Sequence, residues 1–159
     1  MIEEARKKLS TFSLPAKPQT FGEQYVFPEC VDKVSSSDLG SWMFKLAAWK
    51  GYAIKMMADV EIDRAGLKAK HDNRLAKRIA EGSIEKLKVT KDQALGQLII
   101  EDEEFRNIRE RYIIKEVEVE SLKQIVEIYS FQVEVISREI SRRALDIKMM
   151  QRGILEPQD

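Results

Sequence analysis

One heptad register runs through residues 105–150 with few interruptions, and it restricts this chain to a long helix packed along a seam. Twelve of the fourteen a and d residues are apolar or aromatic, and Lys115 and Arg143 are the exceptions. The twelve are Phe105, Ile108, Tyr112, Val119, Leu122, Val126, Tyr129, Val133, Ile136, Ile140, Ile147 and Met150. A sustained period of 3.5 residues is typical of a helix that contacts another helix. The register therefore favours assembly and binding over small-molecule chemistry.

The same helix carries a second apolar row at the c and f positions, roughly opposite the seam. This row consists of Ile114, Val117, Ile128, Phe131, Val135, Leu145 and Met149. A helix that is apolar on two opposite faces must be covered on both. Folded-back terminal segments would cover the second face, and so would identical helices of other subunits. We expect the second arrangement, a homo-oligomer, because closed homo-oligomers are common.

Composition favours a single helical, water-soluble domain. The 159 residues include only seven glycines and four prolines, and 34% of them are charged. No apolar run approaches the roughly 18–20 residues that cross a bilayer, and the start of the chain lacks a signal-peptide pattern. The single cysteine, Cys30, suits a reducing compartment. We expect a cytoplasmic protein without membrane contact.

No set of residues predicts catalysis or metal binding. Cys30 and His71 are the only cysteine and the only histidine, and we expect the first to be packed and the second to lie on the surface. No His, Cys and carboxylate cluster has metal-ligand spacing, and no glycine-rich phosphate loop is present. The acidic run 101–104 is expected at the first turn of the long helix, where it complements the helix dipole. The sequence predicts no enzyme, no catalytic residue, no metal and no cofactor.

The pattern along the chain predicts an all-α fold, an elongated antiparallel helical hairpin or coiled coil that is oligomeric. Residues 1–37 are expected to form a mostly irregular N-terminal arm, whose aromatic residues either anchor it on the bundle or dock a partner protein. The hairpin is expected at 38–153, with helices at about 38–81 and 102–152 and a short helical connector at about 84–100. The N-cap cluster 35–38 starts the first helix, Gly82 ends it, and 154–159 form a tail.

Charge is uneven along a chain whose net charge is zero. Between Arg64 and Lys91 nine Lys or Arg residues face three acidic residues, which gives 9 − 3 = +6. A repeated basic surface of this kind binds a phosphate backbone by counterion release. A solvated face or an acidic protein partner would also account for it. The candidate DNA-binding residues are Arg64, Lys68, Lys70, Arg74, Lys77 and Arg78, and a second basic group is Arg138, Arg142, Arg143, Lys148 and Arg152.

Four side chains are candidates for stacking on the bases of a single strand if they are exposed, namely Trp42, Trp49, Tyr52 and His71. The two tryptophans recur at helical spacing, which favours a place in the core.

The motif Leu67-Lys68-Ala69-Lys70, followed by a turn and a long C-terminal helix, resembles the UvsY family of phage recombination mediators. That family carries Leu-Lys-Ala-Arg, so Lys70 keeps the charge without the planar fork of arginine. The resemblance covers the layout of residues 36–153 and leaves the arm outside. It implies a ring-shaped homo-oligomer that binds single-stranded DNA through the cations matching Lys68 and Lys70. It also implies loading of a RecA-like recombinase in place of the single-strand-binding protein.

We therefore expect a recombination mediator of phage homologous recombination and repair, acting by binding energy alone. Its expected partners are single-stranded DNA, a RecA-like recombinase, the single-strand-binding protein and further copies of itself. Two alternatives remain open. One is a coiled-coil structural or assembly protein of a phage without nucleic-acid binding, and the other is an adaptor that docks proteins through its aromatic arm.

Overall fold

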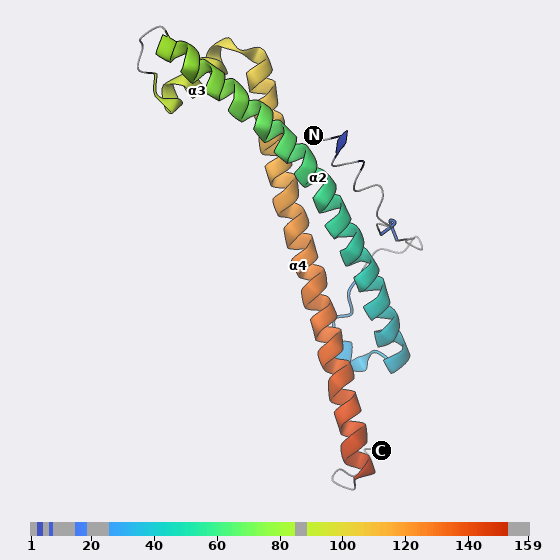
Figure 1. The fold of residues 1–159 in the computed structure, drawn as a ribbon. Coiled ribbons are helices and arrows are strands. Elements are labelled where there is room, and N and C mark those ends of the chain that lie inside the picture. Colours follow the sequence, from blue (N-terminus) through green and yellow to red (C-terminus); the bar gives the residue numbers. More distant parts are fainter. Residues whose placement is uncertain (1–2, 5–6, 8–14, 19–25, 85–88, 153–159) are drawn as a thin grey trace. The chain divides into compact units, whose positions relative to one another are not determined.

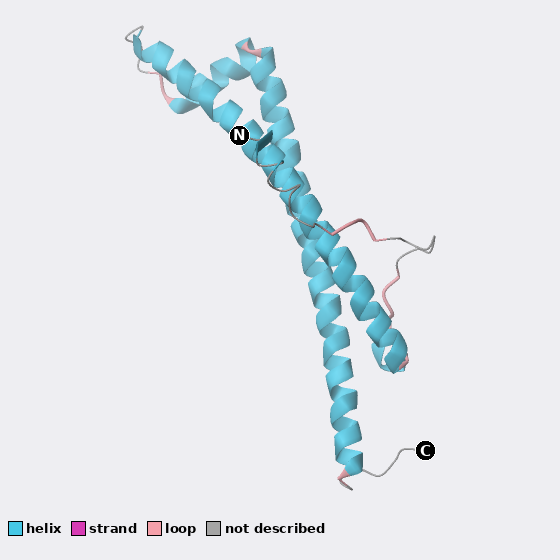
Figure 2. Cartoon of the chain, turned by 45° about the vertical axis from the view of Figure 1, so that its right-hand side comes forward, coloured by secondary structure: helices cyan, strands magenta, loops and turns pink. Residues whose placement is uncertain are grey.

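The computed structural model describes residues 3–4, 7, 15–18, 26–84 and 89–152, and every regular element among them is helical (Figures 1 and 2). The 3-10 helix η1 spans Val31–Lys33, and the α-helices α2, α3 and α4 span Ser36–Ile84, Lys91–Glu101 and Glu103–Gln151. The expected all-α class is confirmed. The chain divides into two compact units. The first contains residues 1–14 and 56–122, and the second contains residues 15–55 and 123–159.

Helix α2 begins at the expected cap and continues beyond the expected end. The Asp38 amide donates to the Ser35 hydroxyl at 3.1 Å, and the Leu39 amide donates to the Ser35 carbonyl at 2.9 Å. These bonds satisfy amides that lack partners inside the helix. At the other end the helix passes through Gly82 and stops at Ile84, so the expected C-cap at Gly82 is wrong. Gly82 itself is buried within the helix.

A reciprocal cap starts α3. The Gln93 amide donates to the Thr90 hydroxyl at 3.3 Å, and the Thr90 amide donates to the Gln93 side-chain oxygen at 3.0 Å. Such a capping box satisfies two unpaired amides at once.

Asp102 separates α3 from α4, and its carboxylate accepts from the Phe105 amide at 2.9 Å. The Arg106 guanidinium donates to the carbonyls of Ile99 and Ile100, at 3.0 and 2.9 Å, where α3 ends. A break in the helix at Asp102 therefore leaves these backbone groups paired.

In the first unit, side chains from the end of α2, from α3 and from the start of α4 pack together. Its buried cluster consists of Leu75, Ala94, Leu98 and Phe105, and Phe105 is completely buried. The ring of His71 stacks on Phe105, with centroids 4.9 Å apart, and its side chain is only 16% exposed. The expected surface position of His71 is therefore wrong, because the histidine ring covers part of the aromatic core.

The second unit packs the start of α2 against the second half of α4. Leu39, Leu46 and Ile136 form its buried cluster. Phe27 of the arm packs on this cluster and meets Trp42 edge-on at 6.2 Å, so this aromatic residue anchors the arm on the helices. The other arm aromatics, Phe12, Phe21 and Tyr25, lie outside the described residues.

Two further arm residues lie close to α2 or in solvent. Pro15 Cγ lies 3.4 Å from where a Cβ on Gly51 would be. Cys30, the residue before η1, is exposed rather than packed.

The a and d residues of α4 are buried or half-buried from Phe105 to Ile136. Beyond them Ile140, Ile147 and Met150 are exposed. The reason lies in the second unit, where the Arg143 guanidinium bonds the Ser36 hydroxyl at the very start of α2. No turn of α2 precedes Ser36 to cover Ile147 and Met150, which follow Arg143 along α4, whereas Ile140 precedes Arg143 and is only 37% exposed.

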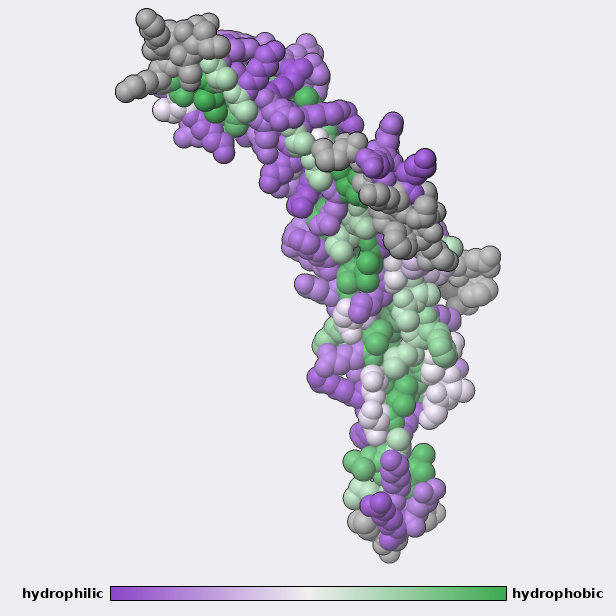
Figure 3. Space-filling model, in the orientation of Figure 1, coloured by the Kyte–Doolittle hydropathy of each residue, from purple (hydrophilic) through white to green (hydrophobic). Residues whose placement is uncertain are grey.

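The second apolar row of α4 remains largely in solvent. Five of its residues are exposed, with Phe131 the most exposed at 65%. These five are Ile114, Val117, Ile128, Phe131 and Leu145, whereas Val135 and Met149 are half-buried. Figure 3 shows apolar side chains at the surface among hydrophilic ones. No segment among the described residues covers the five exposed side chains.

Among the same residues, no helix is long and apolar enough to cross a membrane.

The fold predicts opposite outcomes for two apolar residues of α3. Leu98 is 8% exposed and belongs to the buried cluster, whereas Ile100 is 77% exposed. Leu98→Ala is expected to lower the free energy of unfolding by about 2–5 kcal/mol, because it leaves a cavity. Ile100→Ala is the matched control and is expected to change it by less than about 0.5 kcal/mol. Urea denaturation followed by circular dichroism measures both, and equal losses would contradict the assigned core.

Candidate nucleic-acid interface

Three lysines of α2 in the first unit project into solvent. Lys68, Lys70 and Lys77 are exposed, and the Lys77 side chain is 79% exposed. Neither Lys68 nor Lys70 has an ion-pair partner within the described part of the chain. Lys77 lies 3.9 Å from Glu81, a loose contact between an exposed lysine and a half-exposed glutamate. Exposed pairs of this kind contribute little to stability, so all three charges are available to an external anion.

These lysines do not form a single line. Lys70 and Lys77 are seven residues apart, which places them within about 20° of each other around α2. Lys68 is two residues from Lys70 and therefore lies about 200° away. Between the two sides lies the buried face with Leu67 and Leu75. The two cations of the Leu-Lys-Ala-Lys motif thus flank the packed face of α2 from opposite sides.

The arginines of the same stretch are paired with the acidic run between α3 and α4. The Arg74 guanidinium donates to the carboxylates of both Asp102 and Glu104, and its side chain is 33% exposed. Arg78 lies 3.4 Å from Glu101 and 3.8 Å from Glu81. Arg64 lies 3.9 Å from Glu61. Within the described residues, Arg74 and Arg78 therefore have acidic partners across the unit, Arg64 and Lys77 each have one loose contact at 3.9 Å, and Lys68 and Lys70 have no ion pair.

Asp102 has two roles in this arrangement. It caps α4 through the Phe105 amide and it pairs with Arg74. The Phe105 amide, supported by the Arg74 guanidinium, holds the pKa of Asp102 below its ordinary value. Asp102 therefore stays ionised as a partner for Arg74 at neutral pH. The acidic run is more than a solvated first turn, and the opposite charges at 74–78 and 101–104 were the sequence signal for this pairing.

The candidate stacking side chains are not grouped with the lysines. The His71 ring stacks on two aromatic rings of α4, Phe105 and Tyr112, with a centroid distance of 6.1 Å to Tyr112. Trp42, Trp49 and Tyr52 belong to the second unit and are half-buried. Trp42 also lies under the Lys45 ammonium, at 5.5 Å from the ring centroid. The lysines of the first unit therefore present charge without exposed aromatic neighbours on α2.

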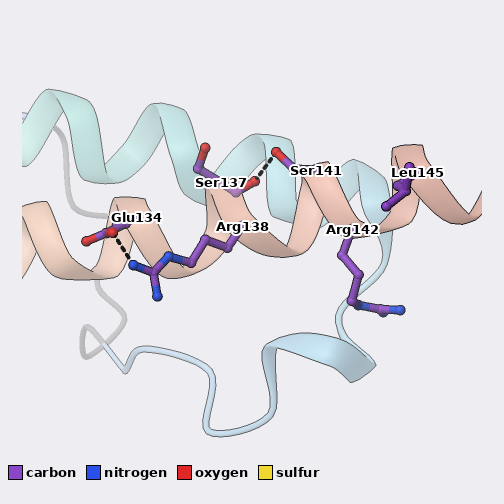
Figure 4. A pocket seen from close by; sticks show the side chains of 6 residues that line it. All are labelled: Glu134, Ser137, Arg138, Ser141, Arg142 and Leu145. Carbon is purple, nitrogen blue, oxygen red and sulfur yellow. Dashed lines mark hydrogen bonds and ion pairs between the residues drawn. The ribbon is translucent and has the colours of Figure 1, made fainter.

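Three arginines of the second basic group, Arg138, Arg142 and Arg143, are paired with carboxylates of α4, whereas Lys148 and Arg152 are exposed. Figure 4 shows a surface groove along α4 where Arg138 and Arg142 extend to the same side. Arg138 bonds Glu134, and Arg142 bonds Glu139 at 2.8 Å and Asp146 at 2.7 Å. Hydrogen bonds from Arg142 and Arg143 lower the pKa of Glu139 from 4.5 to about 2. The groove therefore presents paired arginines, and it is a weaker anion site than the lysines of α2.

Arg143 acts as a structural anchor for the arm. Its guanidinium donates to the carbonyls of Asp32 and Val34, at 2.9 and 2.7 Å, and to Glu139 at 2.7 Å. The other polar residue at a d position, Lys115, bonds Glu118 at 2.6 Å. Both exceptions in the apolar seam therefore have specific partners.

Within the described residues, no group of His, Cys, Asp and Glu is arranged to hold a metal ion. Comparisons with protein-family models, with curated proteins and with solved structures found no match for this chain. The exposure and charge of the α2 lysines are therefore the observations that support a nucleic-acid interface.

Glu139 predicts an acid-dependent loss of stability. Its pKa is lower in the folded state than in the unfolded chain, so its stabilising effect is present above about pH 4.5 and is lost as the pH falls towards about 2. The thermal midpoint is expected to fall across this window, and Glu139→Gln is expected to remove part of the fall. Glu127→Gln, at an exposed position of the same helix, is the control. Circular dichroism measures the thermal midpoint at each pH. Identical pH dependence in the two variants would contradict the role of Glu139.

Proposed function

We propose that this protein is a recombination mediator that binds single-stranded DNA and loads a RecA-like recombinase onto it in place of the single-strand-binding protein. The observation that supports the proposal is the exposure of Lys68, Lys70 and Lys77: the first two have no ion-pair partner within the described residues, and Lys77 has only the loose contact with Glu81 at 3.9 Å. The motif resemblance to phage mediators supports the choice of ligand. The setting is phage homologous recombination and repair.

The mechanism is binding energy without a covalent step. Lysines that neutralise phosphates release condensed counterions, and the affinity therefore falls with salt. In the proposed assembly the subunits are elongated helical hairpins that form a ring, in which the second apolar row of α4 is covered by other subunits. Each subunit adds its lysines to the ring. A strand held along this surface is displaced from the single-strand-binding protein and presented to the recombinase.

Arg74 and Arg78 take a conditional part in this binding. Their guanidinium groups are paired with Asp102, Glu104 and Glu101, so a phosphate must compete with these carboxylates. Lys68 and Lys70 make the first contacts because, within the described residues, no carboxylate pairs with them, and Lys77 is only loosely paired with Glu81. The arginines add to binding where a phosphate exchanges with an acidic partner.

A salt titration tests the role of the lysines. The double variant Lys68→Ala with Lys70→Ala is expected to weaken binding of a single-stranded oligonucleotide and to reduce the slope of log affinity against log salt by roughly 1.4, or 0.7 for each lost contact. Fluorescence anisotropy at several salt concentrations measures both. Lys17→Ala with Lys33→Ala is the control, since it removes two exposed lysines outside the basic stretch.

An unchanged slope in the first double variant, or an equal drop in both, would overturn the DNA-binding role of the motif.

The exposed apolar row supports a second function, a phage assembly protein without a nucleic-acid role. That function predicts an intact oligomer with negligible affinity for single strands at moderate salt.

A pair of adjacent glutamates tests the competition at Arg74. Glu104 pairs with Arg74, whereas its exposed neighbour Glu103 has no ion-pair partner among the described residues. Glu104→Gln is expected to raise the affinity for single-stranded DNA about two- to fivefold, because it frees part of the guanidinium. Glu103→Gln makes the same change in net charge and is expected to have a smaller effect. Equal effects would show that only net charge matters.

A further inference from the structure

Two aromatic side chains of the second unit are left in solvent. Phe44 of α2 is 80% exposed and Phe131 of α4 is 65% exposed. A phenylalanine side chain buries a large area when it is covered, so two such residues indicate surfaces that a partner contacts. Ile128 and Leu145 extend the apolar surface beside Phe131, at 55% and 56% exposure.

The two surfaces point away from each other. Leu46 and Ile136 mark the packed interface between α2 and α4 in this unit. Phe44 is two residues from Leu46, or about 200° around α2, and Phe131 is five residues from Ile136, or about 140° around α4. Both phenylalanines therefore face outwards, one from each helix of the pair. Pairing α4 with α4 of a second copy would cover Phe131 but leave Phe44 in water.

The two surfaces also differ in a complementary way. The residues that share the face of Phe44 are small, and Ser41, Ala47 and Ala48 are exposed, while nothing lies within 4 Å of where a Cβ on Gly40 would be. A neighbouring helix can approach closely over such residues. The face of Phe131 instead carries bulky side chains that would fill the space beside Phe44. Towards its far end the small face is closed by Pro15, which packs over Gly51.

Charge agrees with this pairing. Residues 36–55 carry three lysines against one aspartate, a net charge of 3 − 1 = +2; Lys45 is exposed next to Phe44, and Lys50 and Lys55 are half-buried. Glu127 lies one helical turn before Phe131 and is exposed without an ion-pair partner among the described residues. The arginines on the same side of α4, Arg138 and Arg142, already bond carboxylates.

We propose that the Phe44 face of α2 receives the Phe131 face of α4 from a second copy of this chain, in a head-to-tail contact. One copy of each surface is used in every contact, so the contact repeats from subunit to subunit and either closes into a ring or continues as a filament. This inference rests on the proposed assembly through the second apolar row and is independent of DNA binding.

Mixing two defective variants tests the head-to-tail geometry. Ala48→Glu places a charge on the α2 face, and Phe131→Glu places one on the α4 face. Each variant alone is expected to be a monomer by light scattering after size exclusion, because every possible contact would then include one altered face. An equimolar mixture is expected to form a one-to-one heterodimer and nothing larger, since only one pairing of intact surfaces remains. Ala144→Glu, at another exposed alanine, is the control and is expected to assemble like the wild type.

Three outcomes would overturn the inference. Wild-type protein that is monomeric at all concentrations overturns the proposed assembly as well. Normal assembly of Ala48→Glu shows that the α2 face is unused, and a monomeric mixture shows that the two faces do not bind each other. Circular dichroism checks the helical content of each variant. If a glutamate variant is unfolded, Phe44→Ser and Phe131→Ser replace the pair. They are expected to give the same pattern, with assembly of each single variant weakened rather than abolished.

Discussion

The packing of the a and d side chains of α4 against α2 is the interaction on which both units depend. Phe105 in the first unit and Ile136 in the second are completely buried, and each belongs to a cluster that joins α4 to α2. Each helix carries apolar side chains that the other helix must cover. Most helical stability in water comes from such packing rather than from propensity. The polar exceptions in the seam have specific partners, so they do not interrupt the packing.

Charge pairing then decides which cations remain available. In the first unit the acidic residues between α3 and α4 attract the arginines of α2, and Asp102 both caps α4 and holds Arg74. The lysines on either side of this face stay in solvent. Arginine suits the paired positions because its planar guanidinium reaches two carboxylates at once, whereas a lysine is a single mobile charge. One basic stretch thus serves both the fold and the proposed DNA contact.

Much of the fold was predictable because it follows from local patterns. The heptad register predicted the buried residues of α4 from Phe105 to Ile136, and the serine and aspartate at 35–38 predicted the start of α2. The predictions at Gly82, His71 and Cys30 were wrong for one physical reason. Each assumed that residue type alone sets the environment, whereas a glycine can continue a buried helix and a histidine ring can complete an aromatic cluster. The oligomer and the DNA-binding residues stay predictions.

The sequence by itself determined the helical class, the residues of the seam and the excess of positive charge at 64–91, because periodicity and composition are properties of the chain. Only the tertiary structure decided which positive charges are free. Arg74 meets Asp102 and Glu104, residues 28 and 30 positions further along the chain. No local sequence pattern specifies a contact between residues so far apart along the chain. It was also the tertiary structure that left Phe44 and Phe131 facing outwards, since exposure depends on which faces the two helices use for each other.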